Sequence, residues 1–408
     1  MAIIVQKFGG KSLMDPDRIR SAVERILERK HQGHGMVVVV SAMGSTTDAL
    51  IQLAKQVNPD PHPREMDMLL ATGEQVSIAL VAMALQAKGH DAVSFTGAQV
   101  GIRTDAIHMK AKIKDIRAER LKAALEKGQI AIVAGFQGVT DDEAITTLGR
   151  GGSDTTAVAL AAVLKAELCE IFTDVEGVYT ADPHIVPDAR KIERMSYDEM
   201  MELASLGAKV LQYRAVEFAK KYKVRLVKRS ASSRAEGTLI CEEVEQMEDI
   251  VVSGAALSKD EAKITLVGVS DRPGTAAKIF RQIASRNIVV DMIIQNRSRG
   301  GFTDLTFTVP RTDLKETVAL AETLAKAGDA KEFLADDDVA KVSIVGIGMR
   351  SHCGIAERMF QSLADEKINI DLIATSEIKI SVVIRRKDGE KALRAVHKAF
   401  DLGKGAGK

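Results

Sequence analysis

The sequence predicts an α/β protein: an open, mainly parallel sheet between helices in the first half, followed by two copies of a small α+β module. Two observations support this fold class. In the first half, short apolar or β-branched runs alternate with helical stretches, which is the pattern of βαβ units and a parallel sheet. In the second half, one strand, turn, helix, strand pattern occurs twice. At 408 residues, the chain is long enough for two or three domains with sizeable cores.

Composition and charge narrow the class of protein. Apolar residues make up 46% and charged residues 28%, which is ordinary for a soluble globular protein. A net charge of +1 gives no reason to expect nucleic acid or an anionic membrane as partner. The three cysteines (Cys169, Cys241 and Cys353) are widely spaced without a CxxC, which indicates a reducing compartment and no cysteine-based metal site. With no signal sequence and no 18-residue apolar run, we expect a cytoplasmic protein.

The first expected strand covers residues 3–6 and is followed at once by the glycine turn KFGGKS at residues 7–12. Asp-Pro at residues 15–16 then opens a helix with its apolar residues on one face. This order puts Lys7 and the glycine amides at the carboxyl end of a strand, where open α/β sheets bind ligands. GGKS resembles the tail of a P-loop, but the earlier glycine of that motif falls on Val5, which argues against a Walker-type nucleotide site.

Further strands and helices alternate to about residue 240. Residues 37–40 form a continuous apolar strand, typical of burial on both faces, which leads into Ser41. A proline-bearing surface segment at 58–64 precedes TGEQ at 72–75, which begins a long helix, so Glu74 is expected in a first turn. The other expected elements are strands at 92–95, 130–133, 170–172 and, as the last, 224–227, and helices at 47–54 and, interrupted near Gly207, at 196–218; residues 237–240 close this half.

The loop TTLGRGGSDTT at residues 146–156 combines three glycines, an arginine and an aspartate just before an apolar helical run. Glycines let backbone N–H groups approach a ligand, and the following helix start favours an anion. Arg150 supplies a planar fork for a carboxylate or phosphate. Asp154 cannot hold an anion, so its natural partner is an ammonium group, a metal ion or a catalytic lysine. The loop therefore fits a ligand with both signs of charge, such as an amino acid; a plain turn capped by Ser153 or Asp154 is the alternative.

The segment TDVEGVYTADP at residues 173–183 follows the strand at 170–172. Its polar and glycine turn residues, with one aromatic side chain, suit a pocket for a nucleotide base and ribose; a surface hairpin is the alternative. The acidic stretch at residues 241–249 indicates a linker.

The second half contains an internal repeat. The 34 residues that start at Lys263 align with a segment that starts at Lys341, and each copy reads strand, glycine turn, helix, strand. This is a ferredoxin-like α+β module, present twice. Two copies can pair their sheets and form a binding site remote from the first half; a purely dimer-forming scaffold is the alternative. The matched positions are Gly268 with Gly346, Gly274 with Gly354, Phe280 with Phe360, and Asp291 with Asp371.

With these segments in place, the chain resembles the aspartate kinase family over essentially its full length. The resemblance rests on KFGG at 7–10, TGEQ at 72–75, GFQG at 135–138, the loop at 146–156, the segment at 173–183 and the tandem ACT-type repeats. It implies an amino-acid-kinase fold followed by two ACT modules. The implied domains are a catalytic domain at 1–245, a linker at 246–262, and ACT domains at 263–338 and 339–408, whose sheets can exchange strands.

The resemblance implies a reaction in which ATP phosphorylates L-aspartate to 4-phospho-L-aspartate with Mg²⁺, without a metal site made by the protein alone. This is the first step toward lysine, threonine, methionine and diaminopimelate. Lys7 would neutralise charge on the transferring phosphoryl group, and Asp154 would organise substrate and lysine. The implied substrate-binding residues are Ser41, Glu74, Arg150, Gly151, Gly152, Ser153 and Asp154. The implied nucleotide-binding residues are Lys7, Phe8, Gly9, Gly10, Thr173, Asp174, Tyr179, Asp182 and Lys209.

Two positions depart from the family pattern. Lys11 stands where the family has threonine in KFGGTS, and its ammonium can tighten ATP, displace the substrate or point to solvent. His184 replaces the arginine that commonly follows Asp-Pro, which removes a contact to a nucleotide phosphate.

The repeats resemble modules that sense end products, so the resemblance implies inhibition by lysine, threonine or both. It also implies a homo-oligomer formed through the ACT domains. Met247 lies where some family members start a separately translated regulatory subunit. The implied effector residues are Asp271, Gly274, Ala276, Gln295, Asn369, Ile370, Thr375, Ser376 and Glu377.

Two other functions stay open. One is a kinase for another acidic amino acid, such as glutamate, on the same fold. The other is a catalytically silent amino-acid sensor in which Lys11 has spoiled the phosphate site. A substrate panel separates the first from an aspartate kinase, and ADP release with aspartate separates the second.

Overall fold

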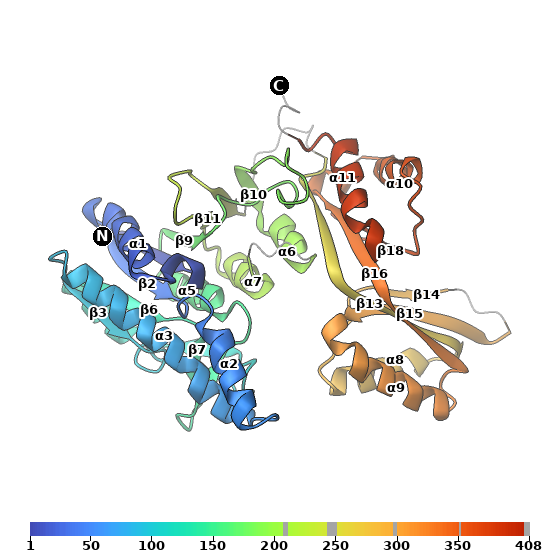
Figure 1. Cartoon of the computed structure of the whole chain (residues 1–408), viewed down its shortest axis with the longest axis horizontal. Coiled ribbons are helices and arrows are strands. Elements are labelled where there is room, and N and C mark those ends of the chain that lie inside the picture. Colours follow the sequence, from blue (N-terminus) through green and yellow to red (C-terminus); the bar gives the residue numbers. More distant parts are fainter. Residues whose placement is uncertain (207–210, 243–250, 297–299, 351, 404–408) are drawn as a thin grey trace. The chain divides into compact units, whose positions relative to one another are not determined.

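The structure, a computed structural model, describes residues 1–206, 211–242, 251–296, 300–350 and 352–403 (Figure 1). The chain forms two compact units. Unit 1 consists of Met1–Val178, Lys191–Ala204 and Lys209–Glu245, and unit 2 of Tyr179–Arg190, Ser205–Ala208 and Gln246–Lys408.

Unit 1 is built on an eight-stranded sheet in the order β10-β12-β11-β9-β1-β2-β6-β3. Every neighbouring pair is parallel except β11 and β12, so the mainly parallel sheet is confirmed. Strands β2 and β6 are apolar and buried along their whole length, as is typical of a parallel sheet covered on both faces. The strands are β1 (Ile3–Phe8), β2 (Gly35–Val40), β3 (Ala92–Phe95), β6 (Ile130–Ala134), β9 (Leu168–Thr173), β10 (Arg194–Ser196), β11 (Leu226–Ser230) and β12 (Thr238–Cys241).

The first helix forms as its sequence predicts. Asp15 accepts a hydrogen bond from the Arg18 backbone N–H at 2.8 Å, Pro16 occupies the first helical position, and one apolar face packs on β1 and β2. The helices of unit 1 are α1 (Pro16–His31), α2 (Thr46–Val57), α3 (Pro63–Gln86), α4 (Glu119–Glu126), α5 (Gly152–Val163), α6 (Tyr197–Ser205) and α7 (Tyr213–Tyr222).

The start expected for the helix that carries Glu74 is wrong. Helix α3 begins at Pro63, inside the segment expected as a surface loop, because proline is well tolerated at a first helical position and His62 accepts a hydrogen bond from the Arg64 backbone N–H. Glu74 therefore lies in the helix interior, far from the positive end of the dipole. Among the described helices, α3 is long and apolar enough to cross a membrane, but half of its most apolar window is buried in the fold.

A second, four-stranded sheet in unit 1 was not expected from the sequence. Its strands have three or four residues each, too short for a clear alternation of apolar and polar positions. It supports the start of the loop at 146–156, because β8 contains Thr146 and Thr147. In the order β5-β4-β7-β8, its strands are β5 (Ile113–Ile116), β4 (Ile102–Thr104), β7 (Gln137–Val139) and β8 (Ile145–Thr147).

Unit 2 contains a six-stranded sheet in the order β14-β15-β13-β16-β18-β17. Two ferredoxin-like modules share this sheet, so the repeat is confirmed as two α+β modules. The elements are β13 (Gly254–Ser270), α8 (Thr275–Ser285), β14 (Ile293–Gln295), β15 (Phe302–Pro310), α9 (Leu314–Lys326), β16 (Glu332–Val345), α10 (Ile355–Asp365), β17 (Leu372–Thr375), β18 (Lys379–Arg385) and α11 (Gly389–Ala399).

The two long strands β13 and β16 are exchanged between the modules. The first part of β13 pairs with the last part of β16, Gly254 opposite Val345, and thereby extends the sheet of the second module. The last part of β13 pairs with the first part of β16, Val267 opposite Glu332, in the first module. The sequence-based linker at 246–262 therefore differs from the structure, in which β13 starts at Gly254; residues 243–250 lie outside the described part.

Matched positions of the repeat have matched structures. Gly274 and Gly354 both precede a helix with a left-handed backbone, at φ +94° and +84°. Lys263 of the first module pairs with Asp371 of the second at 3.2 Å, and Lys341 of the second pairs with Asp291 of the first. The same ion pair thus crosses from each module to the other.

Part of the segment at 173–183 belongs to unit 2. The Thr180 hydroxyl lies 3.0 Å from His397 Nε2 of α11, donates to the Leu402 carbonyl at 2.9 Å and accepts from the Arg190 backbone N–H at 3.0 Å. Ala255 of β13 donates to the Thr180 carbonyl at 2.7 Å. This part of the segment is therefore anchored to the second module.

Candidate active site

Lys7 and Asp154 meet where β1 ends and α5 begins. Side chains alternate along a strand, so Phe8 packs toward α1 while Lys7 points to the opposite face. There its Nζ lies 2.6 Å from Asp154 Oδ1, in a contact that lacks the alignment of a hydrogen bond. Only 9% and 12% of the two side chains are exposed, so the ion pair is nearly dry. This is the ammonium partner that the sequence predicts for Asp154.

Close backbone approaches fix the loops around this pair. A methyl group on Gly10 would lie 2.7 Å from the Ala42 carbonyl oxygen, and one on Gly135 would lie 2.7 Å from Ser153 Cβ. The first contact brings the turn after β1 against the loop after β2, and the second brings the residue after β6 against the first turn of α5. The amino end of α5 carries a partial positive charge, so this end of the sheet favours an anion.

Glu74 reaches the loop after β2 from the interior of α3. Its Oε1 accepts a hydrogen bond from the Ala42 backbone N–H at 3.0 Å, while its buried Oε2 has no hydrogen-bond partner among the described residues. Burial raises the pKa of Glu74 to about 7, against the weaker opposing effect of the hydrogen bond from Ala42. Ser41, which directly precedes Ala42 in the chain, is partly exposed. An unused oxygen here can accept from an ammonium group of a ligand.

Lys228 was missed by the sequence analysis. It lies on β11 and is 2% exposed. Burial lowers its pKa to about 7, with Lys7 acting in the same direction and Asp154 and Asp174 opposing. The available signal was a lysine inside the strand-like run RLVKRS. Burying an ammonium group costs free energy, so a buried lysine often has a functional role.

Asp67 was also missed. This fully buried residue of α3 accepts hydrogen bonds from the Thr147 hydroxyl at 2.5 Å and the Met109 backbone N–H at 3.1 Å, and lies 2.7 Å from His108 Nδ1. It therefore holds the loop at 146–156 in place. A lone aspartate in an apolar helical run was the signal.

The glycine-rich loop ends as the first turn of α5. Gly151 precedes the helix with a left-handed backbone at φ +71°, and Gly152, Ser153 and Asp154 form its first turn, all three buried. Arg150 is exposed just before this turn. The loop thus presents one cation to solvent and one carboxylate to Lys7.

The departure at Lys11 has a local partner. Its Nζ lies 2.8 Å from Asp174 Oδ2, and both side chains are more than half exposed. The hydrogen bond from Lys11 lowers the pKa of Asp174. Thr173 ends β9 beside this pair, and its hydroxyl accepts from the Val175 backbone N–H at 3.3 Å. Asp174 is also close enough to affect Lys228.

The other predicted nucleotide-binding residues lie in the hydrophobic core, in unit 2 or outside the described part of the chain. Phe8 stacks on Phe172 in the hydrophobic core, ring centroids 4.7 Å apart, so only its backbone can face a ligand. Tyr179 and Asp182 belong to unit 2, where the Asp182 carboxylate accepts from the His184 backbone N–H at 2.9 Å. Lys209 lies outside the described residues.

The predicted effector residues lie in both modules of unit 2, and two of them, Gln295 and Thr375, end equivalent strands. Asp271, Gly274 and Ala276 lie at the turn into α8, and Gln295 ends β14. Asn369 and Ile370 precede β17, and Thr375, Ser376 and Glu377 form its turn into β18, where the Ser376 backbone N–H donates to the Lys379 carbonyl at 2.8 Å.

The described residues contain no group of three His, Cys, Asp or Glu side chains that could hold a metal ion. Mg²⁺ commonly binds through substrate phosphates and only one or two carboxylates. Asp154 and Asp174, which both affect Lys228, therefore fit a magnesium ion that arrives with a nucleotide.

Family profiles and relatives agree with this layout. The profile of the Amino acid kinase family matches residues 2–228, and ACT domain profiles match residues 263–329 and 342–400. The chain is 52% identical to an aspartate kinase of Pseudomonas putida over 98% of both chains, and 52% identical to aspartokinase 2 of Bacillus subtilis over 99% of both. The crystal structure of E. coli aspartokinase III in complex with aspartate and ADP has a TM-score of 0.84 at 26% identity, covering 97% of this chain and 99% of that one.

Proposed function

This chain belongs to the aspartate kinase family, a family of ATP-dependent phosphotransferases with a carboxyl group as acceptor, and from that premise we propose how its own residues carry out the transfer. ATP gives its terminal phosphoryl group to the side-chain carboxylate of L-aspartate, and the products are 4-phospho-L-aspartate and ADP. The observation that supports this most directly is the nearly dry pair of Lys7 and Asp154 under the amino end of α5.

Lys7 and Lys228 neutralise the charge that moves with the phosphoryl group. Transfer of a phosphoryl group needs positioning in line and neutralisation of charge rather than a covalent nucleophile. The two ammonium groups come from β1 and β11, which flank β9, and Gly9 and Gly10 directly follow β1. Asp154 holds Lys7 in place. Mg²⁺, when bound with ATP, supplies further charge neutralisation; the residues described here bind and orient.

Aspartate is recognised by groups of both signs. Glu74 Oε2 accepts from the substrate ammonium group, because it is buried and none of the described residues bonds to it. Arg150 binds the α-carboxylate, and the first turn of α5, with Gly151, Gly152 and Ser153, and Ser41 frame the reacting carboxylate. E. coli aspartokinase III, with aspartate and ADP bound, supports an amino acid and a nucleotide in one such site.

The nucleotide is held by Thr173 and Asp174 at the end of β9, and by Tyr179, Asp182 and Lys209. Lys11 belongs to this region through Asp174, so we infer that it contacts ATP phosphates rather than the amino acid. His184 donates its backbone N–H to Asp182 and so orients that carboxylate.

The ACT modules regulate the enzyme. We infer inhibition by lysine, threonine or both at the turns into α8 and β18, and a homo-oligomer formed through these modules. A structure of E. coli aspartokinase III with lysine and aspartate, TM-score 0.75, supports lysine as an effector. The reaction opens the synthesis of lysine, threonine and methionine, in the cytoplasm.

The test is aspartate-dependent hydroxamate formation with ATP and hydroxylamine, on the unaltered chain and on Lys7→Met. Loss of one charge partner of the transition state lowers turnover by about 10²- to 10³-fold. Lys55→Met, in exposed α2, is the matched control and keeps full activity.

Two further arms separate the alternatives. Glutamate in place of aspartate tests for a different acidic substrate, and lysine plus threonine at saturating aspartate tests regulation. No ADP release with aspartate from the unaltered chain, with lysine or threonine still bound, would establish the silent sensor instead. Unchanged velocity with both amino acids would exclude the regulatory role of the ACT modules.

A further inference from the structure

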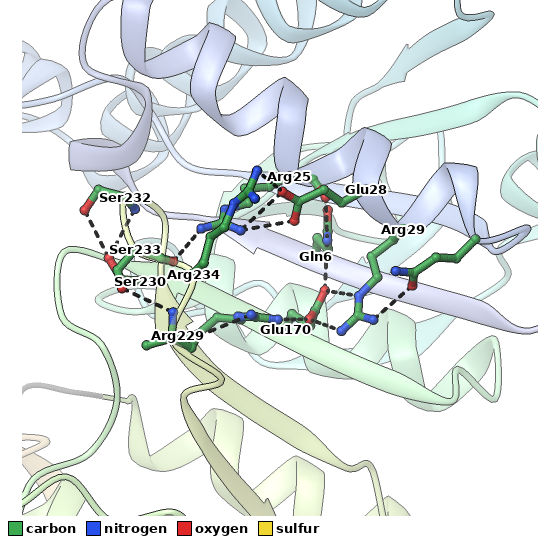
Figure 2. A network of polar contacts seen from close by, with 12 residues as sticks. Gln6, Arg25, Glu28, Arg29, Glu170, Arg229, Ser230, Ser232, Ser233 and Arg234 are labelled. Carbon is green, nitrogen blue, oxygen red and sulfur yellow. Dashed lines mark hydrogen bonds and ion pairs between the residues drawn. The ribbon is translucent and has the colours of Figure 1, made fainter.

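A cavity of about 420 Å³ lies on the face of the unit 1 sheet opposite Lys7 and Asp154. Figure 2 shows the polar contacts of several residues that line it. The catalytic proposal does not use it. Its size falls within the roughly 300–1,000 Å³ of sites for small molecules. Its inner lining residues include Gln6, Arg25, Arg29, Glu170, Phe172 and Arg229.

Strand alternation separates this cavity from the active site while keeping the two adjacent in sequence. Gln6 and Lys7 are neighbours on β1 and point to opposite faces, and Lys228 and Arg229 do the same on β11. A ligand in the cavity would lie against the reverse side of the strands that carry both catalytic lysines.

The centre of the cavity wall is a buried carboxylate with three partners. Glu170 accepts from Arg29 Nη2 at 2.7 Å, Arg229 Nη1 at 2.8 Å and Gln6 Nε2 at 2.8 Å (Figure 2). Burial would raise the pKa of Glu170, but the hydrogen bonds from Arg29 and Gln6 and the charges of both arginines lower it overall. Arg25, buried on α1, adds a third guanidinium. The inner wall thus has three cations against one anion.

The rim has the opposite sign. Glu28 and Glu236 both line the cavity and both are exposed. Glu28 pairs with Arg25 Nη1 at 3.1 Å. Glu28 also pairs with Arg234 Nη2 at 3.5 Å, so the carboxylate at the entrance that has no ion-pair partner among the described residues is that of Glu236.

Two polar atoms on the inner wall lack partners. Gln6 Oε1 and Arg229 Nε are buried without a hydrogen-bond partner among the described residues, and Gln6 is only 1% exposed. Leaving such a buried group unpaired costs free energy that a bound partner would recover. One atom requires a donor and the other an acceptor, and both side chains bond to the same carboxylate of Glu170, so a single small ligand can satisfy the two.

We propose that this cavity binds a free α-amino acid, whose ammonium group donates to Gln6 Oε1 and whose carboxylate accepts from Arg229 Nε. An α-amino acid carries its cationic ammonium donor and its anionic carboxylate acceptor on the same carbon, which matches this pair of atoms. The ligand stem lies along Phe172, and a basic side chain extends to Glu28 and Glu236 at the rim. The class is therefore α-amino acids, with basic ones bound most tightly.

The probe is L-ornithine, which is neither the proposed substrate nor a proposed effector. Calorimetric titration of the full chain should show one binding event that is weaker with L-alanine, which cannot reach the rim. N-acetylation of the α-amino group and esterification of the carboxylate should each weaken binding about tenfold or more, because each removes one charge-assisted hydrogen bond.

Arg229→Lys keeps a positive charge beside Glu170 but removes the Nε donor, and Gln6→Met keeps the volume but removes the acceptor. Each should weaken L-ornithine binding about tenfold. Arg20→Lys is the matched control, on the exposed face of α1, and should bind normally. Thermal unfolding of every variant establishes that it is folded.

Three outcomes would overturn the proposal: no binding of L-ornithine at millimolar concentration, equal binding by Arg229→Lys and the unaltered chain, or a crystal structure grown with L-ornithine in which water alone fills the cavity. None of them bears on aspartate phosphorylation, because Lys7→Met tests that activity separately.

Discussion

Glu74 and Lys228 are buried ionisable side chains whose pKa values both lie at about 7, reached from opposite directions. Glu74 has to lose its proton to accept from a substrate ammonium group. Lys228 has to keep its proton to neutralise a phosphate. The same burial therefore sets a lower and an upper pH limit for one reaction.

The raised pKa of Glu74 predicts how the free energy of unfolding changes with pH. Its pKa is raised in the folded chain, so the folded state binds more protons than the unfolded state between pH 4.5 and about 7. The free energy of unfolding should fall across this window, by up to about 3 kcal/mol. Glu74→Gln cannot ionise, so its stability relative to the unaltered chain should increase from pH 5 to pH 8 in urea unfolding without ligands. An exposed change, Glu126→Gln, should show no such trend, and a constant difference for Glu74→Gln would contradict the raised pKa.

The lowered pKa of Lys228 predicts how kcat/KM for ATP changes with pH. Its pKa is lowered to about 7, so the protonated fraction declines as pH rises through neutrality, and kcat/KM for ATP should decline with it. Lys228→Arg retains its charge above pH 7 and should flatten this decline even if its absolute rate is lower. Lys228→Met should lose about 10²-fold at all pH values. The same decline in Lys228→Arg and the unaltered chain would place the titrating group elsewhere.

Comparing the predicted with the observed helices and strands shows which parts of the fold could be predicted from the sequence. The strands β1, β2, β3, β6 and β9 were found because each contains a short apolar or β-branched run and alternates with a helical stretch, and the repeat was found because its glycines recur. The start of α3 was missed because a proline suggests a loop although it also suits a first helical turn. The small sheet was missed because its strands are too short to show a period. Lys228 and Asp67 were missed because no local pattern reveals which buried charges meet across the fold.

The exchanged strands β13 and β16 lead to a prediction at the element scale. Lys341 is 2% exposed, contacts Glu261 at 2.7 Å and pairs with Asp291, whereas the equivalent Lys263 is 20% exposed. Lys341→Met leaves two carboxylates uncompensated and should destabilise unit 2 by about 3 kcal/mol. Lys263→Met should cost about 1 kcal/mol or less.

Hydrogen exchange of the β13 and β16 amides in the full chain measures this difference. Adding Glu261→Gln to Lys341→Met should recover part of the loss, because one of the uncompensated charges is then gone. Equal protection in the two single variants would show that burial of this pair does not contribute to stability.

The segment at residues 173–183, which is proposed to hold ATP, runs from unit 1 into unit 2. Thr173 and Asp174 belong to unit 1, while Tyr179 and Asp182 belong to unit 2, and Thr180 anchors the latter pair to α11 through its hydroxyl. Tyr179 and Asp182 are proposed to bind the nucleotide, so the anchoring of this part of the segment should be visible in nucleotide binding.

Thr180→Val keeps the shape of the side chain but removes its hydrogen bonds to His397, Leu402 and Arg190. The loss of about 1 kcal/mol of net hydrogen bonding at this anchor should raise KM for ATP severalfold to about tenfold, with a smaller effect on kcat and on KM for aspartate. Thr323→Val is the matched control, because its exposed hydroxyl bonds only to the Ala319 carbonyl of its own helix. If Thr180→Val lowers thermal stability while KM for ATP stays unchanged, the anchor serves only the fold of unit 2, and Tyr179 and Asp182 do not bind the nucleotide.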